Sequence, residues 1–468
     1  MAEQPAAAAA SAPNTPKMLD VASMDVATAV HTLIDHAARI GASDLFFLAN
    51  EDYTSIQVRH LGIMRPISIV GADQGVRFVQ HVKANAGMDV GEHRRPLDGR
   101  WIYESEDGTA VDLRINDIPT LYGEDLTMRL LSREQGLLAL DDLGMIPPQL
   151  QAFRGMLTSP SGLILCTGPT GSGKTATLYA ALRHLNNGQR KINTIEDPVE
   201  FSIDGMRQSQ INTHIGVGFA DLLRSVLRQS PDIVMIGEIR DAETARTAVR
   251  AANSGHLVFS TLHAPVAAAA IQSMRSLGVP DHFLATSLRG IIAQRLVRTF
   301  CPDCKQEFDI SHAPDTFDEV SHLLDGQVTT KLAAAPGCAK CGQSGYAGRL
   351  GVFEVMDINR ELRNLIAHGH PTEEVRRKAV ANGMLEFRQA ALLQVARGYT
   401  SVEEVFRVIP SEHLLLDDGV TTDDRKDEKK EEPAREAPAK SAPKSTPKAS
   451  SKKKTKKKTT RSRSSASS

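Results

Sequence analysis

The sequence predicts an α/β chain in which a parallel sheet, covered by helices on both faces, follows a smaller α+β domain. Residues 161–166, 232–236 and 255–260 are near-continuous apolar runs separated by stretches with helical periodicity. Strands of this composition are buried on both faces, as in parallel sheets. Alternating apolar and polar residues at 55–59 and 111–115 indicate half-exposed strands in the preceding domain.

Composition and periodicity divide the chain into consecutive segments. Apolar residues recur at helical spacing over 24–40, whereas 141–144 has the composition of a linker. The expected segments are a disordered leader (1–20), an N-terminal α+β domain (21–133), a linker (134–143), an α/β core (144–299), a cysteine module (300–345), a C-terminal helical subdomain (346–417) and a disordered basic tail (418–468).

The overall composition is that of an ordinary globular protein, with 41% hydrophobic and 24% charged residues. No apolar run approaches the roughly 20 residues that span a bilayer. The N-terminus has no basic start followed by an apolar stretch, so it does not predict a secretory signal. We therefore expect a cytosolic protein whose membrane contact, if any, is peripheral.

The formal net charge of −1 conceals two opposed regions. Residues 440–468 contain 11 basic and no acidic residues, which leaves 44 basic against 56 acidic residues elsewhere, a net charge of −12. The simplest interpretation of the basic run is a solvated, disordered tail. The alternatives are attraction to anionic lipid or to nucleic acid.

A phosphate-binding loop is the strongest signal in the sequence, because it lies between a predicted strand and a predicted helix. In this motif the backbone N–H groups and the helix N-terminus surround phosphates. Lys174 is expected to bind the β- and γ-phosphates of ATP, and Thr175 to bind Mg²⁺. The alternative is a chance glycine-rich turn, which the flanking strand and helix argue against. The residues that match GxxxxGK[ST] are Gly168, Pro169, Thr170, Gly171, Ser172, Gly173, Lys174 and Thr175.

Two acidic positions at strand ends are candidates for the hydrolytic step, which requires groups that orient water and the metal. Glu238 follows the apolar strand 232–236, as in a Walker B element. Glu196 lies in the acidic run 194–200 between that strand and the phosphate loop. For the acidic run, the alternative is a capped and solvated loop.

Four of the five cysteines form two CxxC pairs separated by 33 residues. Thiolates with this spacing in a cytosolic chain suit one tetrahedral, structural Zn²⁺ site with no open coordination position. The alternatives are buried free thiols or redox pairs. The candidate ligands are Cys301, Cys304, Cys338 and Cys341. Cys166 lies in the strand before the phosphate loop and is expected to be a core residue.

Taken together, the motifs GPTGSGKT, TIEDPVEF, LRSVLRQSPDIVMIGEIRD and GHLVFSTLH resemble the secretion ATPase superfamily, most closely its GspE/PilB type. The resemblance covers residues 42–408. It implies a PAS-like N-terminal domain and a RecA-like ATPase domain that rotate about bound Mg²⁺ and ATP. It also implies a homo-oligomer, a hexamer, that acts on an inner-membrane platform protein from the cytoplasmic side.

The resemblance also assigns roles to individual residues. Glu238 becomes the Walker B glutamate and Glu196 the Asp-box glutamate, and either could be the base. His256 and His263 form the His box, and they are expected to sense the γ-phosphate, although single histidines usually serve packing. Four arginines are expected near the phosphates, with surface ion pairs as the alternative for each: Arg114, Arg129, Arg224 and Arg228.

The sequence departs from the family pattern at a few positions, including Phe46, Leu48 and Ser230, and it does not show the N-terminal docking domain common in GspE/PilB proteins. None of these changes removes a candidate phosphate-binding or catalytic group. The resemblance implies assembly of a type IV pilus or a type II secretion pseudopilus, and the tetracysteine module favours assembly over retraction. The alternatives are a motor for conjugation-linked pili or DNA uptake, and a nucleotide-binding scaffold without turnover.

Overall fold

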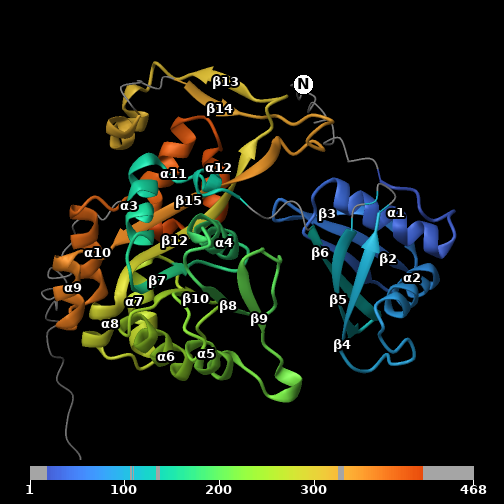
Figure 1. The fold of residues 1–468 in the computed structure, drawn as a ribbon. Coiled ribbons are helices and arrows are strands. Elements are labelled where there is room, and N and C mark those ends of the chain that lie inside the picture. The colour runs from blue at the N-terminus through green and yellow to red at the C-terminus, as the bar shows by residue number, and fades with distance from the viewer. Residues whose placement is uncertain (1–17, 106–107, 109, 133–137, 325–330, 415–468) are drawn as a thin grey trace, which may run out of the picture. The chain divides into compact units, whose positions relative to one another are not determined.

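The computed structural model describes residues 18–105, 108, 110–132, 138–324 and 331–414 (Figure 1). Nearly all of the expected leader, the first part of the expected linker and the whole basic tail lie outside the described residues. Among the described helices, none combines the length and the apolar character that crossing a membrane requires.

The N-terminal part contains a six-stranded sheet with the strand order β3-β2-β1-β6-β5-β4, in which all neighbouring strands are antiparallel. The two helices of this part pack against each other and against the sheet. The elements are α1 (Val26–Arg39), β1 (Asp44–Ala49), β2 (Tyr53–His60), β3 (Ile63–Gly71), α2 (Ala72–Asn85), β4 (Leu97–Glu104), β5 (Ala110–Thr120) and β6 (Gly123–Ser132).

Helix α1 illustrates how the local sequence determines an element in this part. The Asp25 carboxylate accepts a hydrogen bond from the Thr28 N–H (3.1 Å) and so caps the first turn. Val30, Leu33 and Ile34 then recur at helical spacing and are fully buried against the sheet. The predicted helix at 24–40 therefore forms within one or two residues of its expected bounds.

The C-terminal part contains a seven-stranded sheet with the order β15-β12-β7-β11-β10-β8-β9, in which all pairs are parallel except β12 with β15. Its elements up to the sheet's last parallel strand are η1 (Leu140–Leu143), α3 (Pro147–Leu157), β7 (Gly162–Thr167), α4 (Lys174–Leu185), β8 (Ile192–Glu196), β9 (Met206–Gln210), η2 (Thr213–Ile215), α5 (Phe219–Leu227), β10 (Ile233–Ile236), α6 (Ala242–Asn253), β11 (Leu257–Leu262), α7 (Ala267–Ser276), α8 (Asp281–Ser287) and β12 (Leu288–Phe300).

A small hairpin, one long strand and a set of helices complete the C-terminal part. These elements are β13 (Gln306–Asp309), η3 (Pro314–Leu323), β14 (Lys331–Ala334), β15 (Tyr346–Asp357), α9 (Arg360–Ala367), α10 (Thr372–Ala381), α11 (Phe387–Ala396), α12 (Val402–Val408) and η4 (Ser411–His413). Strands β13 and β14 pair only with each other.

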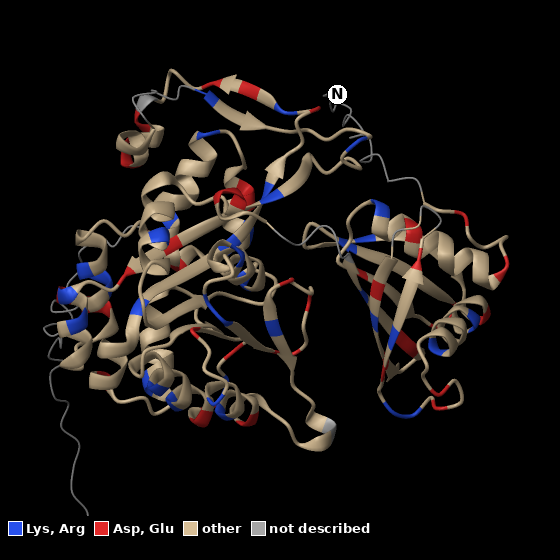
Figure 2. Cartoon of the chain, viewed as in Figure 1, with Lys and Arg blue, Asp and Glu red and all other residues tan. Residues whose placement is uncertain are grey.

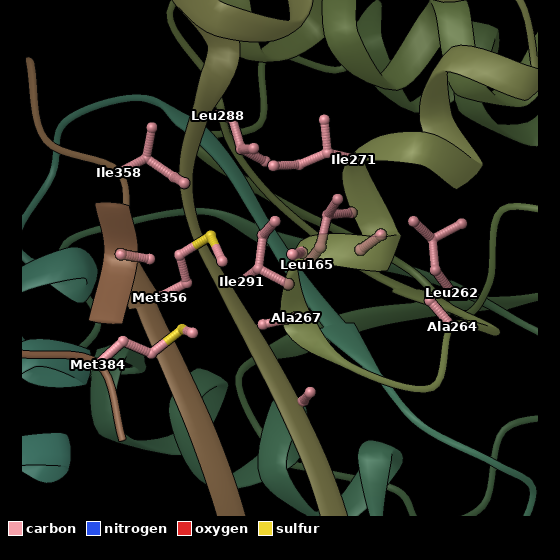
Figure 3. Packing of buried hydrophobic residues seen from close by; sticks show 14 of the residues in the cluster. Leu165, Leu262, Ala264, Ala267, Ile271, Leu288, Ile291, Met356, Ile358 and Met384 are labelled. Carbon is pink, nitrogen blue, oxygen red and sulfur yellow. The ribbon is translucent and has the colours of Figure 1, made fainter. Parts of the chain in front are cut away.

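Each central strand of the large sheet contributes alternate residues to two hydrophobic clusters. Ile164 and Cys166 of β7 pack with α3 and α4, whereas Leu163 and Leu165 pack with α5 to α8 and α11. Figure 3 shows part of the second cluster, with Leu165 beside residues from β12 and β15. The expected fold class, a parallel sheet covered on both faces, is confirmed.

Two expected segments differ from the structure. Residues 346–357 were assigned to a helical subdomain but form β15, the antiparallel edge strand of the main sheet. The run Val352–Met356 is buried almost completely and is apolar except for Glu354, and a short run of this kind does not distinguish a buried strand from a helix by periodicity. The described part of the expected linker is also structured, because Leu140 and Leu143 are buried in the cluster around α3 and α4.

Candidate nucleotide site

The phosphate loop connects the end of β7 to the start of α4. Gly168, Gly171 and Gly173 all adopt positive φ angles (147°, 76° and 88°), which side chains rarely tolerate. A Cβ atom at Gly168 would lie 2.6 Å from the Gln294 carbonyl oxygen, so a larger residue does not fit there. The loop thus forms a tight backbone turn at the N-terminus of a 12-residue helix, which is the geometry that binds anions.

Lys174 begins helix α4 and folds back over the loop. Its ammonium donates hydrogen bonds to the carbonyls of Gly168 (2.8 Å) and Pro169 (3.0 Å). Burial lowers the pKa of Lys174. The cation is therefore held within the loop, where a phosphate group would accept its hydrogen bonds.

Gln294 of β12 supports the loop from behind. Its amide nitrogen donates to the Ser172 carbonyl (2.5 Å), and its amide oxygen accepts a hydrogen bond from the Cys166 thiol (3.1 Å). Burial raises the pKa of Cys166 to about 12, as expected for a core thiol. This contact could not be predicted from the sequence, because Gln294 is distant in the chain and belongs to no motif.

Glu196 ends β8 and is enclosed by protein donors. The side chain is 2% exposed and accepts hydrogen bonds from Tyr179, Thr194 and the Gln208 amide (3.2 Å for the last). Burial, followed by the charge of Glu196, raises the pKa of Tyr179, so the phenol remains a donor. The hydrogen bonds of the Glu196 carboxylate thus join α4 and β9 to β8.

Glu200, in the same acidic run, was not among the predicted site residues. Its carboxyl interacts with the hydroxyl of Thr175, the predicted Mg²⁺ ligand. The acidic run indicated that carboxylates gather here, but it gave no spacing rule that separates Glu200 from Glu196.

Glu238 lies just after β10, the neighbour of β11 in the sheet, and β11 separates β10 from β7 and its phosphate loop. Its carboxylate pairs with Arg240 and lies 3.6 Å from Nε2 of His263. Its negative charge also acts on Lys174. The Gly237 N–H donates to the Ile195 carbonyl (2.7 Å), which fixes this turn beside the end of β8. The carboxyl ends of the three parallel strands β7, β11 and β10 therefore bring Lys174, His263 and Glu238 to one edge of the sheet.

His256 is not brought to this edge. It immediately precedes β11, whose six residues span about 20 Å, and its Nδ1 lies 3.0 Å from the Ala251 carbonyl at the end of α6. Within one chain, the two histidines of the predicted pair lie at opposite ends of the strand. The sequence pattern could have shown this, because a strand of six residues separates them.

Arg224 lies with His256 rather than with the phosphate loop. Both line a groove of about 680 Å³ between α5 and α6, together with Arg246 and Arg250, and Figure 2 shows basic residues on both helices. Arg224 pairs with Asp221 (2.6 Å) and with Glu243, and Arg228 donates to Ser225 (3.3 Å).

Arg114 and Arg129 belong to the N-terminal part. They are direct partners on β5 and β6, so their side chains leave the sheet on the same face. Arg129 lies 3.2 Å from Asp44, which also pairs with Arg59 (3.4 Å). The structure thus brings these two predicted arginines together on one face of the first sheet.

The four predicted zinc ligands come together beside the β13–β14 hairpin. All four sulfur atoms lie within 4.8 Å of one another. The distances are 4.0 Å for Cys301–Cys338, 3.9 Å for Cys304–Cys341 and 3.8 Å for Cys338–Cys341. A tetrahedral site with bonds of ~2.3 Å requires S–S separations of ~3.8 Å. The N–H groups of Cys338 and Gly345 also donate to the Cys341 sulfur (3.2 Å each), as expected around a thiolate.

The fold and the site define a P-loop nucleoside triphosphatase of the RecA-like class. The model of the family described as "Type II/IV secretion system protein" matches residues 21–407. The type II secretion system ATPase E of Vibrio cholerae is 41% identical over 381 residues, which cover 81% of this chain and 74% of that protein. The type IV pilus assembly ATPase PilB of Pseudomonas aeruginosa is 38% identical over 81% of this chain and 66% of its own length. The chain belongs to the type II/IV secretion system protein family, and it is an ATPase.

A solved structure supports the fold. The ATPase DotB of Legionella pneumophila superposes with a TM-score of 0.60 over 84% of this chain and 96% of its own, at 20% identity.

Proposed function

We propose that this ATPase is a motor for the assembly of a type IV pilus or a type II secretion pseudopilus. It acts as a homo-oligomer, a hexamer, at the cytoplasmic face of the inner membrane, where it turns a platform protein. The similarity to both an ATPase E and a PilB, each at about 40% identity over four fifths of the chain, carries the proposal.

The phosphate loop, Lys174 and Thr175 hold Mg²⁺ and ATP in this proposal. The backbone turn and the helix N-terminus bind the phosphates, and the Thr175 hydroxyl binds the metal with Glu200 beside it. Bound Mg²⁺ would supply neutralisation of the charge that develops on the phosphates.

Glu238 is the residue that we assign to orient and activate water. Its carboxylate lies 3.6 Å from Nε2 of His263 and its charge acts on Lys174, whereas the oxygens of Glu196 are already used by three protein donors. His263 senses the γ-phosphate beside Glu238. Arg114 and Arg129 supply positive charge from the first lobe. Arg224 and Arg228 act from the C-terminal end of α5 of a neighbouring subunit, because Arg224 lies with His256 and not at the phosphate loop of its own chain.

The proposed function is tested in the organism that carries this chain. Replacing the chromosomal copy by a Lys174→Ala form should abolish the surface filaments or the secreted enzymes of one machine and leave others unchanged. The proposal fails if every such machine works normally although the variant accumulates to the wild-type level and has lost ATPase activity.

We also propose that the four clustered cysteines bind one structural Zn²⁺. The sulfur separations suit tetrahedral coordination, and the backbone donors to Cys341 suit a thiolate. In small zinc peptides such binding contributes roughly 10–16 kcal/mol, so the metal should dominate the stability of the β13–β14 region, which has little core of its own.

Cys304→Ser should reduce bound zinc from about one ion per chain to nearly none. Metal analysis and hydrogen exchange provide the measurement: protection should fall around β13 and β14, while Mg²⁺–ATP binding persists. Cys166→Ser is the matched control, because that thiol is buried away from the cluster, and it should keep the metal. Wild-type protein purified without zinc, but with the hairpin fully protected, would contradict the proposal.

A further inference from the structure

The short loop that follows His263 is tied to the phosphate loop at its beginning. Thr167, the last residue of β7, accepts a hydrogen bond from the Ala264 N–H (2.8 Å) and donates one to the Ala264 carbonyl (2.9 Å). Thr167 immediately precedes Gly168. The position of His263 is therefore linked to the strand that presents the phosphate loop.

The end of the same loop is held by Glu354 of β15. One oxygen of this carboxylate accepts the N–H of Ala267, the first residue of α7 (2.8 Å). The other accepts the N–H of Phe387, the first residue of α11 (3.1 Å). One carboxylate thus caps two helices whose starts are 120 positions apart in the sequence.

Arg295 of β12 bridges the same two segments. Its guanidinium donates to the Pro265 carbonyl (2.9 Å) and lies over the Phe387 ring, 5.2 Å from the ring centroid. The side chain is 4% exposed. The adjacent residue on β12 is Gln294, which supports the phosphate loop.

Glu354 lies on β15 between Val352 and Met356 of the large hydrophobic cluster, and the charges of Glu386 and Arg295 also act on it. Figure 3 shows the chain passing from Leu262 through Ala264 to Ala267 beside β12 and β15, with Met356 and Met384 nearby. Burial raises the pKa of Glu354 to about 7. A carboxyl group in such surroundings is costly unless both oxygens are hydrogen-bonded, and two helix N-termini supply the donors.

We propose that Glu354 is a positioning residue for ATP hydrolysis: it holds the His263 loop in register with the N-terminus of α11, so that the nucleotide site and the C-terminal helices shift together. This rests on the proposed roles of Glu238 and His263. A change at His263 moves Ala267, and the shared carboxylate transmits that movement to Phe387.

Glu354→Gln tests the proposal. Glutamine has one acceptor oxygen, so either the Ala267 or the Phe387 N–H loses its partner and faces an amide NH₂. We expect kcat for ATP hydrolysis to fall about tenfold while KM for ATP changes less than about threefold, since the phosphate-loop contacts remain, as for an interaction that matters mainly in the transition state.

Hydrogen exchange gives a readout that a purely structural role would not move. In the wild type, adding Mg²⁺ with a non-hydrolysable ATP analogue should raise protection at 264–267 and at the start of α11 together. In Glu354→Gln this joint response should be lost, so that only the first segment, or neither, responds.

Glu404→Gln is the matched control. Glu404 is similarly buried (1% exposed) and accepts hydrogen bonds from Arg298 and Arg407, but it lies within α12, which Ser401 caps, and these bonds join α12 to β12 and not to the His263 loop. It should lower the melting temperature without changing kcat. If Glu354→Gln does not fold, Glu354→Asp serves instead, because its shorter side chain keeps the charge but reaches only one helix.

The proposal is overturned if folded Glu354→Gln, or its aspartate substitute, keeps both the wild-type kcat and the joint protection, or if Glu404→Gln lowers kcat equally. Glu238→Gln, measured in parallel, distinguishes a failure of the positioning role of Glu354 from a failure of the roles proposed for Glu238 and His263. If Glu238→Gln retains full turnover, the roles assigned to Glu238 and His263 are wrong. If Glu354→Gln retains full turnover but Glu238→Gln does not, only the positioning role of Glu354 is wrong.

Discussion

Glu238→Gln should bind Mg²⁺–ATP within a few-fold of the wild-type affinity but hydrolyse it far more slowly. Glutamine keeps the size and one acceptor oxygen of glutamate, but it can neither take a proton from water nor pair with His263 and Arg240. Loss of a positioned general base typically costs about 10²–10⁴ in rate, and we expect kcat to fall within that range. Phosphate release under saturating ATP measures it.

The matched control is Glu319→Gln. Glu319 pairs with Arg388 (2.8 Å) and has a similarly shielded carboxylate, 26% exposed against 15% for Glu238, but it lies in η3 rather than at the nucleotide edge. Its kcat should equal that of the wild type. Unchanged turnover in Glu238→Gln would instead transfer the role of the base to another carboxylate, with Glu200 the next candidate because it reaches Thr175.

Lys174→Ala should lose both nucleotide affinity and turnover. The lysine is the only side-chain cation that the described structure places within the loop, where it donates to two loop carbonyls. Charge-assisted hydrogen bonds contribute about 1.5–3 kcal/mol each, so we expect Mg²⁺–ATP to bind roughly 10–100-fold more weakly, with turnover near background. Isothermal titration and phosphate release measure the two effects.

Lys191→Ala is the control for the loss of a lysine. Lys191 donates to the Gln229 carbonyl and immediately precedes β8, at the edge of the sheet opposite the phosphate loop. Lys191→Ala removes the same charge from the same domain as Lys174→Ala but leaves the phosphate loop intact, so affinity and turnover should remain at wild-type values. Equal weakening in both variants would mean that net charge, rather than the contact in the loop, accounts for binding.

Elements with strong local signals could be predicted from the sequence. The apolar runs that became β7 and β10 were expected within one residue, and the helix expected after the phosphate loop forms as α4. The strand expected at 255–260 forms two residues later, because the glycine at its start belongs to a turn. Strand β9 has a polar sequence, MRQSQ, and forms because it completes the exposed edge beside β8. Such pairing is a tertiary effect that local propensity does not encode.

The candidate site shows the same division. The phosphate loop and Glu238 follow from local motifs, because a strand, a turn and a helix lie consecutively in the chain. Gln294, which supports the phosphate loop, and Tyr179, which donates to Glu196, carry no motif, and each finds its partner only through the packing of separate elements. The contact of Glu354 with the first residues of α7 and α11 also depends on the packing of distant elements. In the sequence, Glu354 is one residue of a strand without a motif. Only the fold brings the N-termini of two helices to its carboxylate.

The central claim is that a backbone loop with Lys174 holds the triphosphate while a separate carboxylate, Glu238, enables its hydrolysis. Equilibrium binding of Mg²⁺–ATP to wild type, Lys174→Ala and Glu238→Gln tests it most directly. We predict tight binding to wild type and Glu238→Gln, and weak binding to Lys174→Ala. Undiminished binding to folded Lys174→Ala, or loss of binding in Glu238→Gln, would contradict it.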